Sequence, residues 1–210
     1  MRLLDIGLQK LTNNMQKMAE LSKETVKLAV KAYLSNEHVI DKVFENSEKL
    51  RHLQDEVSEL AVELIVRHQP VASDLRYIKA CMEIAYGFSR FGRYAYDIMD
   101  VLEVFGDLSL CDNSKIVEAS KIVENMIELS IEAFIKNDLE LAKKVEEMDD
   151  QVDEIYENHI KNLIKIKEAN LSCAVAATLI LRYLERIADH ATYISEAVFY
   201  IVKGERKPRK

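Results

Sequence analysis

The sequence contains little proline and glycine, the two residues that most often interrupt regular backbone structure. Only two of the 210 residues are proline and five are glycine, whereas 49% are hydrophobic and 31% are charged. Proline breaks helices because it lacks an N–H donor, and glycine weakens them through the backbone entropy it loses on folding. Their scarcity, beside a plentiful supply of apolar and charged residues, predicts an all-α protein with long helices and a sizeable core.

Cysteine is also scarce, and the spacing of the three that are present indicates neither a zinc site nor a disulfide framework. Cys81, Cys111 and Cys173 lie far apart in the chain, so we expect core or linker thiols in a reducing compartment. No run of 18 apolar residues is present, and the N-terminal stretch is too short and too polar for a signal peptide. We therefore expect a soluble, cytoplasmic protein.

A basic surface is lacking as well. The formal net charge is −7 at pH 7, which argues against general nucleic-acid binding, because such proteins need a positively charged face. The basic run KGERKPRK at the end of the sequence is interpreted as a short solvated tail. No nucleophile elbow, P-loop or glycine-rich dinucleotide loop occurs, so the motifs favour a protein that is not an enzyme.

Six segments carry apolar residues mostly three or four positions apart, which is the spacing of amphipathic helices. The expected helices span residues 11–34, 37–68, 74–105, 114–136, 139–168 and 171–203. We expect Asn36 to cap the start of the second helix, Pro70 to end it, and Gly204 to end the last. Residues 106–113 form the main linker, so we expect two tandem three-helix bundles, in residues 1–108 and 109–210.

An internal repeat supports this division. The segment LAVKAYLSNE (28–37) parallels LSIEAFIKND (129–138), and residues 43–51 align with residues 145–153. In the same way SRFGRYAYDIMD (89–100) aligns with ERIADHATYISE (185–196). The six helices are therefore predicted to arise by duplication of one three-helix unit.

Two pairs of carboxylates in the second repeat are the main candidates for a functional site. Asp149 and Asp153 are four residues apart, and so are Glu185 and Asp189, which places each pair on one face of its helix. If both pairs face the same bundle interior, four negative charges converge and need a cation. Carboxylate-only ligand sets suit iron, manganese, magnesium or calcium, and zinc is also compatible with them.

The first repeat does not carry these carboxylates. The alignment places Ser47, Arg51, Ser89 and Arg93 at the corresponding positions, so four acidic residues in one half face two serines and two arginines in the other. Arginines repel cations. We therefore predict one metal site at most, in the second bundle.

Other interpretations of the acidic pairs stay open. Carboxylates four residues apart are common on solvated helix faces, and Arg186 could neutralise part of the charge through a salt bridge. His190 follows Asp189 but points about 100° away around the helix, so we consider it a less favoured metal ligand than the four carboxylates. A di-iron site for oxygen chemistry needs Glu-x-x-His pairs, and no histidine in the sequence has a glutamate three residues before it.

The sequence resembles the PhoU family of phosphate-uptake regulators. The similarity is carried by HQPVASDLRYIKA (68–80), DDQVDEIY (149–156) and above all RYLERIADHATYISEAVFYIVKG (182–204), and it extends over roughly residues 10–204. The resemblance implies two three-helix bundles whose E(D)xxxD motifs hold multinuclear iron or zinc clusters on the bundle surface. Those motifs match this chain only at Asp149, Asp153, Glu185 and Asp189, so a multinuclear metal cluster is expected in the second bundle alone.

The resemblance also implies a function. Family members are non-catalytic negative regulators of high-affinity phosphate uptake and phosphate signalling. They contact the ATPase subunit of a phosphate ABC transporter and, in many bacteria, a sensor histidine kinase. We expect the same partners here, with attachment to the membrane only through them, and a homodimer stays open. The alternatives are a carboxylate-bridged metal-binding or metal-storage protein, or a helical adaptor for another transporter.

Overall fold

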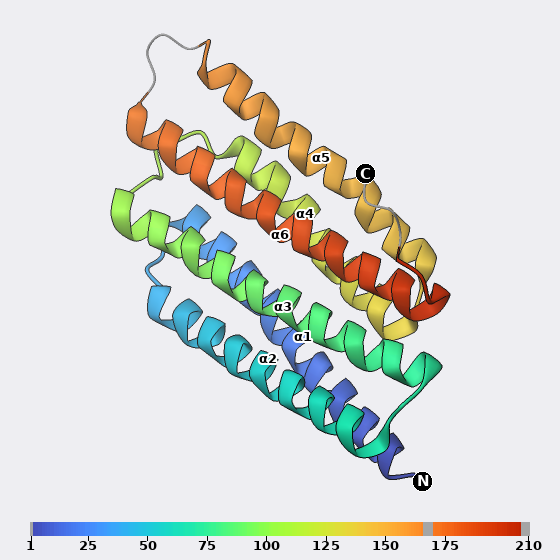
Figure 1. The fold of residues 1–210 in the computed structure, drawn as a ribbon. Helices are drawn as coiled ribbons and strands as arrows, with labels where there is room; N and C mark the ends of the chain where they lie inside the picture. Colours follow the sequence, from blue (N-terminus) through green and yellow to red (C-terminus); the bar gives the residue numbers. More distant parts are fainter. Residues whose placement is uncertain (1, 166–169, 207–210) are drawn as a thin grey trace.

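The structure is a computed structural model that describes residues 2–165 and 170–206. The described residues form six long helices: α1 (Leu3–Ser35), α2 (Ile40–His68), α3 (Ala72–Phe105), α4 (Ser114–Lys136), α5 (Leu139–Leu163) and α6 (Leu171–Lys203). Figure 1 shows that α1–α3 and α4–α6 form two three-helix bundles lying side by side. The expected all-α fold of two tandem bundles is confirmed. Within the described residues, no helix is long and apolar enough to cross a membrane.

Both bundles turn from their first helix to their second at an asparagine. Asn36 ends α1 with φ 55°, and its repeat counterpart Asn137 ends α4 with φ 52°. Asparagine enters this left-handed region more readily than most residues. The expectation that Asn36 caps the start of α2 is therefore wrong: it ends the preceding helix, and α2 begins later, at Ile40.

The remaining helix ends follow local sequence signals, with two differences. Pro70 stands two residues after the end of α2, and Gly204 ends α6 with φ 79°, as expected. Helix α1 begins at Leu3 rather than at residue 11, because its first turns also pack against the core. Helix α5 ends at Leu163 rather than at residue 168, and residues 166–168 of the expected helix lie outside the described residues.

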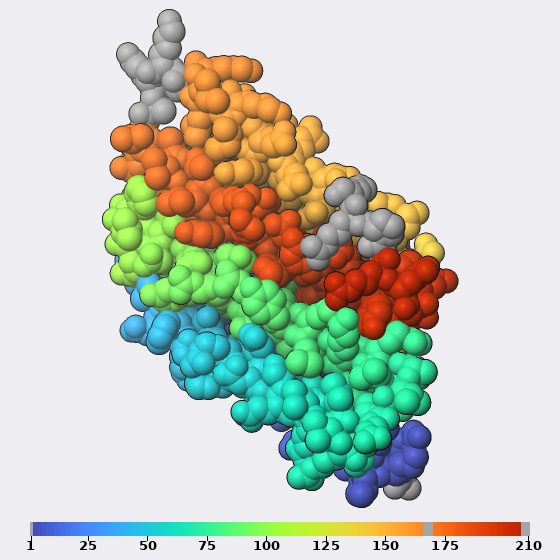
Figure 2. Space-filling view, viewed as in Figure 1, coloured from blue at the N-terminus to red at the C-terminus, as the bar shows by residue number. Residues whose placement is uncertain are grey.

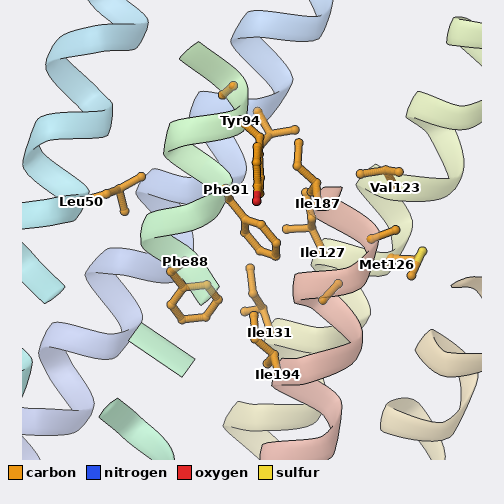
Figure 3. Packing of buried hydrophobic residues seen from close by; sticks show 14 of the residues in the cluster. Leu50, Phe88, Phe91, Tyr94, Val123, Met126, Ile127, Ile131, Ile187 and Ile194 are labelled. Atoms are coloured by element: carbon orange, nitrogen blue, oxygen red, sulfur yellow. The ribbon is translucent and has the colours of Figure 1, made fainter. Parts of the chain in front are cut away.

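The two bundles share a continuous hydrophobic core, in which α3 and α6 pack against each other. Figure 3 shows Phe88, Phe91 and Tyr94 of α3 beside Ile187 and Ile194 of α6. Both phenylalanines are completely buried. Truncating a buried phenylalanine to alanine typically costs about 3–5 kcal/mol, so this junction contributes strongly to the stability of the whole chain.

The expectation that the cysteines form no disulfide is wrong. Cys111, in the linker between the bundles, is joined to Cys173, in the first turn of α6, and their Cα atoms are 5.5 Å apart. The two residues are 62 positions apart in sequence, so only the packing of α4 against α6 reveals that they meet. Cys81 is a free thiol in the core, as expected. Because disulfides are uncommon where thiols are kept reduced, cysteine usage does not indicate a reducing compartment.

Candidate metal centre

The two acidic pairs occupy facing positions of α5 and α6, at the edge of the second bundle's core. Val152 of α5 and Leu184 and Ala188 of α6 are buried and hold the two helices together. The carboxylates lie beside these apolar contacts. Asp149, Glu185 and Asp189 are half-buried, whereas Asp153 is exposed.

The four side chains, called the carboxylate cluster below, are close enough to repel one another. Burial, followed by repulsion from Asp153, Asp189, Asp150 and Glu185, raises the pKa of Asp149 to about 7. Burial is also the largest cause of the raised pKa values of the other three members: Asp153, Glu185 and Asp189. The structure therefore brings all four predicted site residues together.

Two oxygen atoms of the cluster lack a partner. Asp149 Oδ1 and Glu185 Oε2 are buried and have no hydrogen-bond partner in the described structure. Leaving a buried polar atom without a partner costs roughly 1–3 kcal/mol, and more for a charged group. Carboxylate oxygens in this condition suit coordination of a cation, which would satisfy them and screen the repulsion between the helices.

Two arginines on α6 neutralise part of the cluster. Arg182 donates a hydrogen bond to Glu185 and lies over the ring of Tyr156, 5.7 Å from its centroid. Arg186 Nη1 lies 3.9 Å from Asp189 Oδ2. The sequence interpretation considered Arg186 and missed Arg182, although a spacing of three residues before Glu185 was a usable signal.

The cluster is not assembled around a single point. Within residues 2–165 and 170–206, no three histidine, cysteine, aspartate or glutamate side chains are placed to share one metal ion. The donor chemistry fits a cation, but the side chains must rotate to bind one. Arg182 already occupies one oxygen of Glu185. Metal binding therefore stays a prediction.

His190 faces away from the carboxylate cluster, toward the junction between the bundles. Its ring lies 5.4–5.8 Å, between centroids, from the rings of Tyr86, Tyr94 and Tyr193. Burial, followed by the nearby charges of Arg90 and Arg186, lowers the pKa of His190 to about 4. The residue is thus a neutral packing group of the junction.

In the first bundle, the counterpart positions are stabilised by ion pairs within single helices. Arg51 Nη2 lies 3.0 Å from Glu48 Oε2 on α2, and Arg93 Nη2 lies 2.9 Å from Asp97 Oδ1 on α3. Arg93 also lies over the ring of Tyr96, 5.5 Å from its centroid. Two arginines stand where the second bundle has carboxylates, so these positions do not suit a cation.

In the first bundle, α2 and α3 also pack closely at the positions that correspond to the carboxylate cluster. Gly92 aligns with Ala188 of the second repeat. A Cβ atom on Gly92 would lie 2.6 Å from Leu50 Cδ1 and 3.2 Å from Ser47 Cα. Glycine is therefore what allows α2 and α3 to approach so closely here.

Comparison with known proteins gives a match over both halves of the chain. The model of the PhoU domain matches residues 15–102 and again residues 116–198. The chain is 27% identical over 205 residues to phosphate-specific transport system accessory protein PhoU homolog 1 of Methanothermobacter thermautotrophicus, covering 95% of this chain and 94% of that protein. It is 30% identical over 194 residues to the PhoU homolog of Aquifex aeolicus, covering 90% of this chain and 88% of that protein.

Solved structures match over nearly the full length as well. The crystal structure of PhoU from Pseudomonas aeruginosa has a TM-score of 0.87 at 26% identity, covering 96% of this chain and 99% of that one. The phosphate transport system regulatory protein PhoU from Streptococcus pneumoniae has a TM-score of 0.89 at 21% identity, covering 98% and 100%. The second similarity supports the fold alone.

Proposed function

Because this chain belongs to the PhoU family, we propose that it is an accessory protein of phosphate transport that acts by binding other proteins. The observation that carries this proposal is the match of the PhoU domain to both bundles. Relatives named as phosphate-specific transport system accessory proteins align with nearly the whole chain. A regulatory role without catalysis is consistent with the domain match and with the names of these relatives.

We further propose that the protein is a cytoplasmic negative regulator of high-affinity phosphate uptake and phosphate signalling. Its partners would be the ATPase subunit of a phosphate ABC transporter, a sensor histidine kinase, or both. Helix α2 supports the idea of protein contacts, because Val62 and Val66, one turn apart on it, are 52% and 71% exposed. Exposed apolar side chains grouped on one helix are typical of surfaces that bind other proteins.

We also propose that the carboxylate cluster holds iron or zinc. Asp149 and Asp153 on α5, with Glu185 and Asp189 on α6, would supply the oxygen ligands. Support comes from the two unpartnered oxygens and from the raised pKa of each member. Binding would remove the repulsion between α5 and α6 and stiffen the second bundle, while the first bundle would stay free of metal.

A pull-down with the purified ATPase subunit, at high and at low phosphate, tests the regulatory proposal. We expect capture of the subunit, with more captured at high phosphate, where uptake has to be restrained. Val66→Asp should weaken capture without altering the circular dichroism spectrum. A matched change at another exposed residue of α2, Lys42→Asp, should leave capture unchanged. Absence of capture at both phosphate concentrations would contradict the proposal.

A second assay tests the absence of catalysis. Metal-loaded protein should show no phosphatase or oxidase turnover above that of free metal ions. Turnover that disappears in Glu185→Ala would assign an enzyme activity to the carboxylate cluster, contrary to our proposal.

A further inference from the structure

A groove runs along the junction of the bundles where α3 lies beside α6. Figure 2 shows the two helices as adjoining green and red bands. The groove has a volume of about 420 Å³. Its lining combines acidic and aromatic groups, chief among them Glu83, Tyr86, His190, Tyr193, Glu196 and Tyr200. We call it the junction groove.

Aromatic rings form much of the wall. Tyr86 and Tyr193 are 51% and 44% exposed, and both pack edge-on against His190, with ring centroids 5.7 and 5.4 Å away. Packing on His190 restricts the two tyrosines, so their rings form a preformed surface. The negative faces of such rings attract cations, and they attract guanidinium groups in particular.

The junction groove already holds one cation, from this chain's own C-terminal segment. Arg206 is part of the lining, and its Nη2 donates a 2.6 Å hydrogen bond to Glu83 Oε1. A second cation lies at the edge of the groove: Lys79 Nζ is 3.9 Å from the same oxygen and 5.1 Å from the ring centroid of Tyr200. Lys79 thus interacts with both Glu83 and Tyr200, so an acidic and an aromatic side chain of the groove act together on one positive charge.

The turn at Gly204 positions Arg206. Gly204 has φ 79°, in the left-handed region that other residues rarely adopt. A Cβ atom on it would lie 3.5 Å from Cζ of Arg76 on α3. This turn brings the chain back over α3 after the end of α6, and Arg206 meets Glu83 as a result.

We propose that the junction groove is a binding site for an arginine side chain in a basic segment of a partner protein. Arg206 is then an internal competitor that occupies the site until a partner replaces it. Both partners of the Arg206–Glu83 pair are largely exposed, with 62% and 42% of their side chains accessible. An exposed pair of this kind is weak, so it can be exchanged. The net charge of −7 adds a general attraction for basic segments.

This inference does not depend on the proposed role in phosphate transport, nor on metal in the carboxylate cluster. It assigns a chemical class of ligand, an arginine flanked by basic residues, to the junction groove between α3 and α6. The carboxylate cluster lies elsewhere, between α5 and α6. A competitor within the same chain would limit binding to partners present at sufficient concentration or carrying several basic residues.

Fluorescence anisotropy with a labelled peptide GERKPRK, which has the sequence of residues 204–210, tests the proposal in the full-length protein. Arg206→Ala should bind this peptide about threefold more tightly than the unmodified chain, because a weak internal competitor has been removed. Gly204→Ala should have the same effect, because its side chain strains the turn that delivers Arg206. The peptide GEKKPKK, with the same charge, should bind several-fold more weakly.

Glu83 and Glu63 provide a matched pair of variants. Each is an exposed glutamate that pairs with an arginine, Glu83 with Arg206 and Glu63 with Arg67. In the Arg206→Ala background, Glu83→Gln should abolish peptide binding and Glu63→Gln should leave it unchanged, with equal melting temperatures. Equal affinity of the two peptides, equal effects of the two glutamate variants, or no gain from Arg206→Ala would overturn the proposal.

Discussion

Arg182 donates a hydrogen bond to Glu185 one turn further along α6, so a guanidinium occupies part of the carboxylate cluster. The Glu185 side chain is only 12% exposed, and its second oxygen has no partner. One oxygen is therefore paired and the other is not. Any cation that binds all four carboxylates has to compete with Arg182.

Removal of this competitor should strengthen metal binding. In Arg182→Gln the side chain keeps its polarity and loses its charge, so we expect zinc affinity to rise about fivefold, or ~1 kcal/mol. Isothermal titration calorimetry with Zn²⁺ measures the change. The matched variant Arg51→Gln, in the first bundle, should bind zinc like the unmodified protein. Weaker binding in Arg182→Gln would mean that Arg182 supports the site.

The raised pKa of Asp149 predicts how pH affects the metal-free protein. Its pKa is about 7 in the folded chain, against an ordinary value of 3.8, so the folded state holds the proton more tightly than the unfolded state. Stability from this group is fully present below pH 3.8 and is lost as pH rises through 7. In the presence of chelator, Asp149→Asn should therefore stabilise the protein by roughly 1–2 kcal/mol more at pH 8 than at pH 5.

Urea unfolding at the two pH values measures this difference. The control is Asp55→Asn, at an exposed position of α2 where the carboxylate lies 3.5 Å from Arg51. This variant should change stability equally at both pH values. If Asp149→Asn destabilises the protein more at pH 8, the repulsion among the carboxylates is not the dominant effect.

Reduction of the Cys111–Cys173 disulfide should destabilise the chain. The bond closes a loop of 62 residues, and releasing such a loop lowers the free energy of unfolding by about 4 kcal/mol. Chemical denaturation with and without dithiothreitol measures the loss. The reductant should have no effect on the double variant Cys111→Ser, Cys173→Ser.

Thiol counting provides an independent check on the disulfide. Burial raises the pKa of the Cys81 thiol to about 12, and the residue is completely buried. Iodoacetamide at pH 8 should therefore label no cysteine in the native, oxidised protein and one cysteine after denaturation. Labelling of three cysteines in denatured protein that has not been reduced would show that the disulfide is absent.

Much of the fold could be predicted because the relevant signals are local. Apolar periodicity located all six helices. The spacing of four residues placed each acidic pair on one face of its helix, but whether the two pairs face each other was left open by the sequence and is seen only in the packing of α5 against α6. The position of Asn36 was misread because asparagine favours both helix starts and left-handed helix ends. Only the preceding turns of α1, which continue to Ser35, decide between these two roles.

The details of the site depended on information that the sequence does not contain. The pairing of Cys111 with Cys173 depends on the packing of α4 against α6, which brings the linker before α4 beside the start of α6, and no spacing rule reveals it. The contact between Arg206 and Glu83 joins residues 123 positions apart. Arg182, by contrast, was visible three residues before Glu185, and its effect on the carboxylate cluster could have been predicted from helix geometry alone.

The most direct test is metal content in two variants at aligned positions, one in each bundle. The unmodified protein, Asp189→Ala and Arg93→Ala would be incubated with Fe²⁺ or Zn²⁺, desalted, and analysed by inductively coupled plasma mass spectrometry. We predict that the unmodified protein and Arg93→Ala retain equal amounts of metal and that Asp189→Ala loses it, with all three equally helical. Metal-free unmodified protein, or equal loss from both variants, would contradict a single metal site in the second bundle.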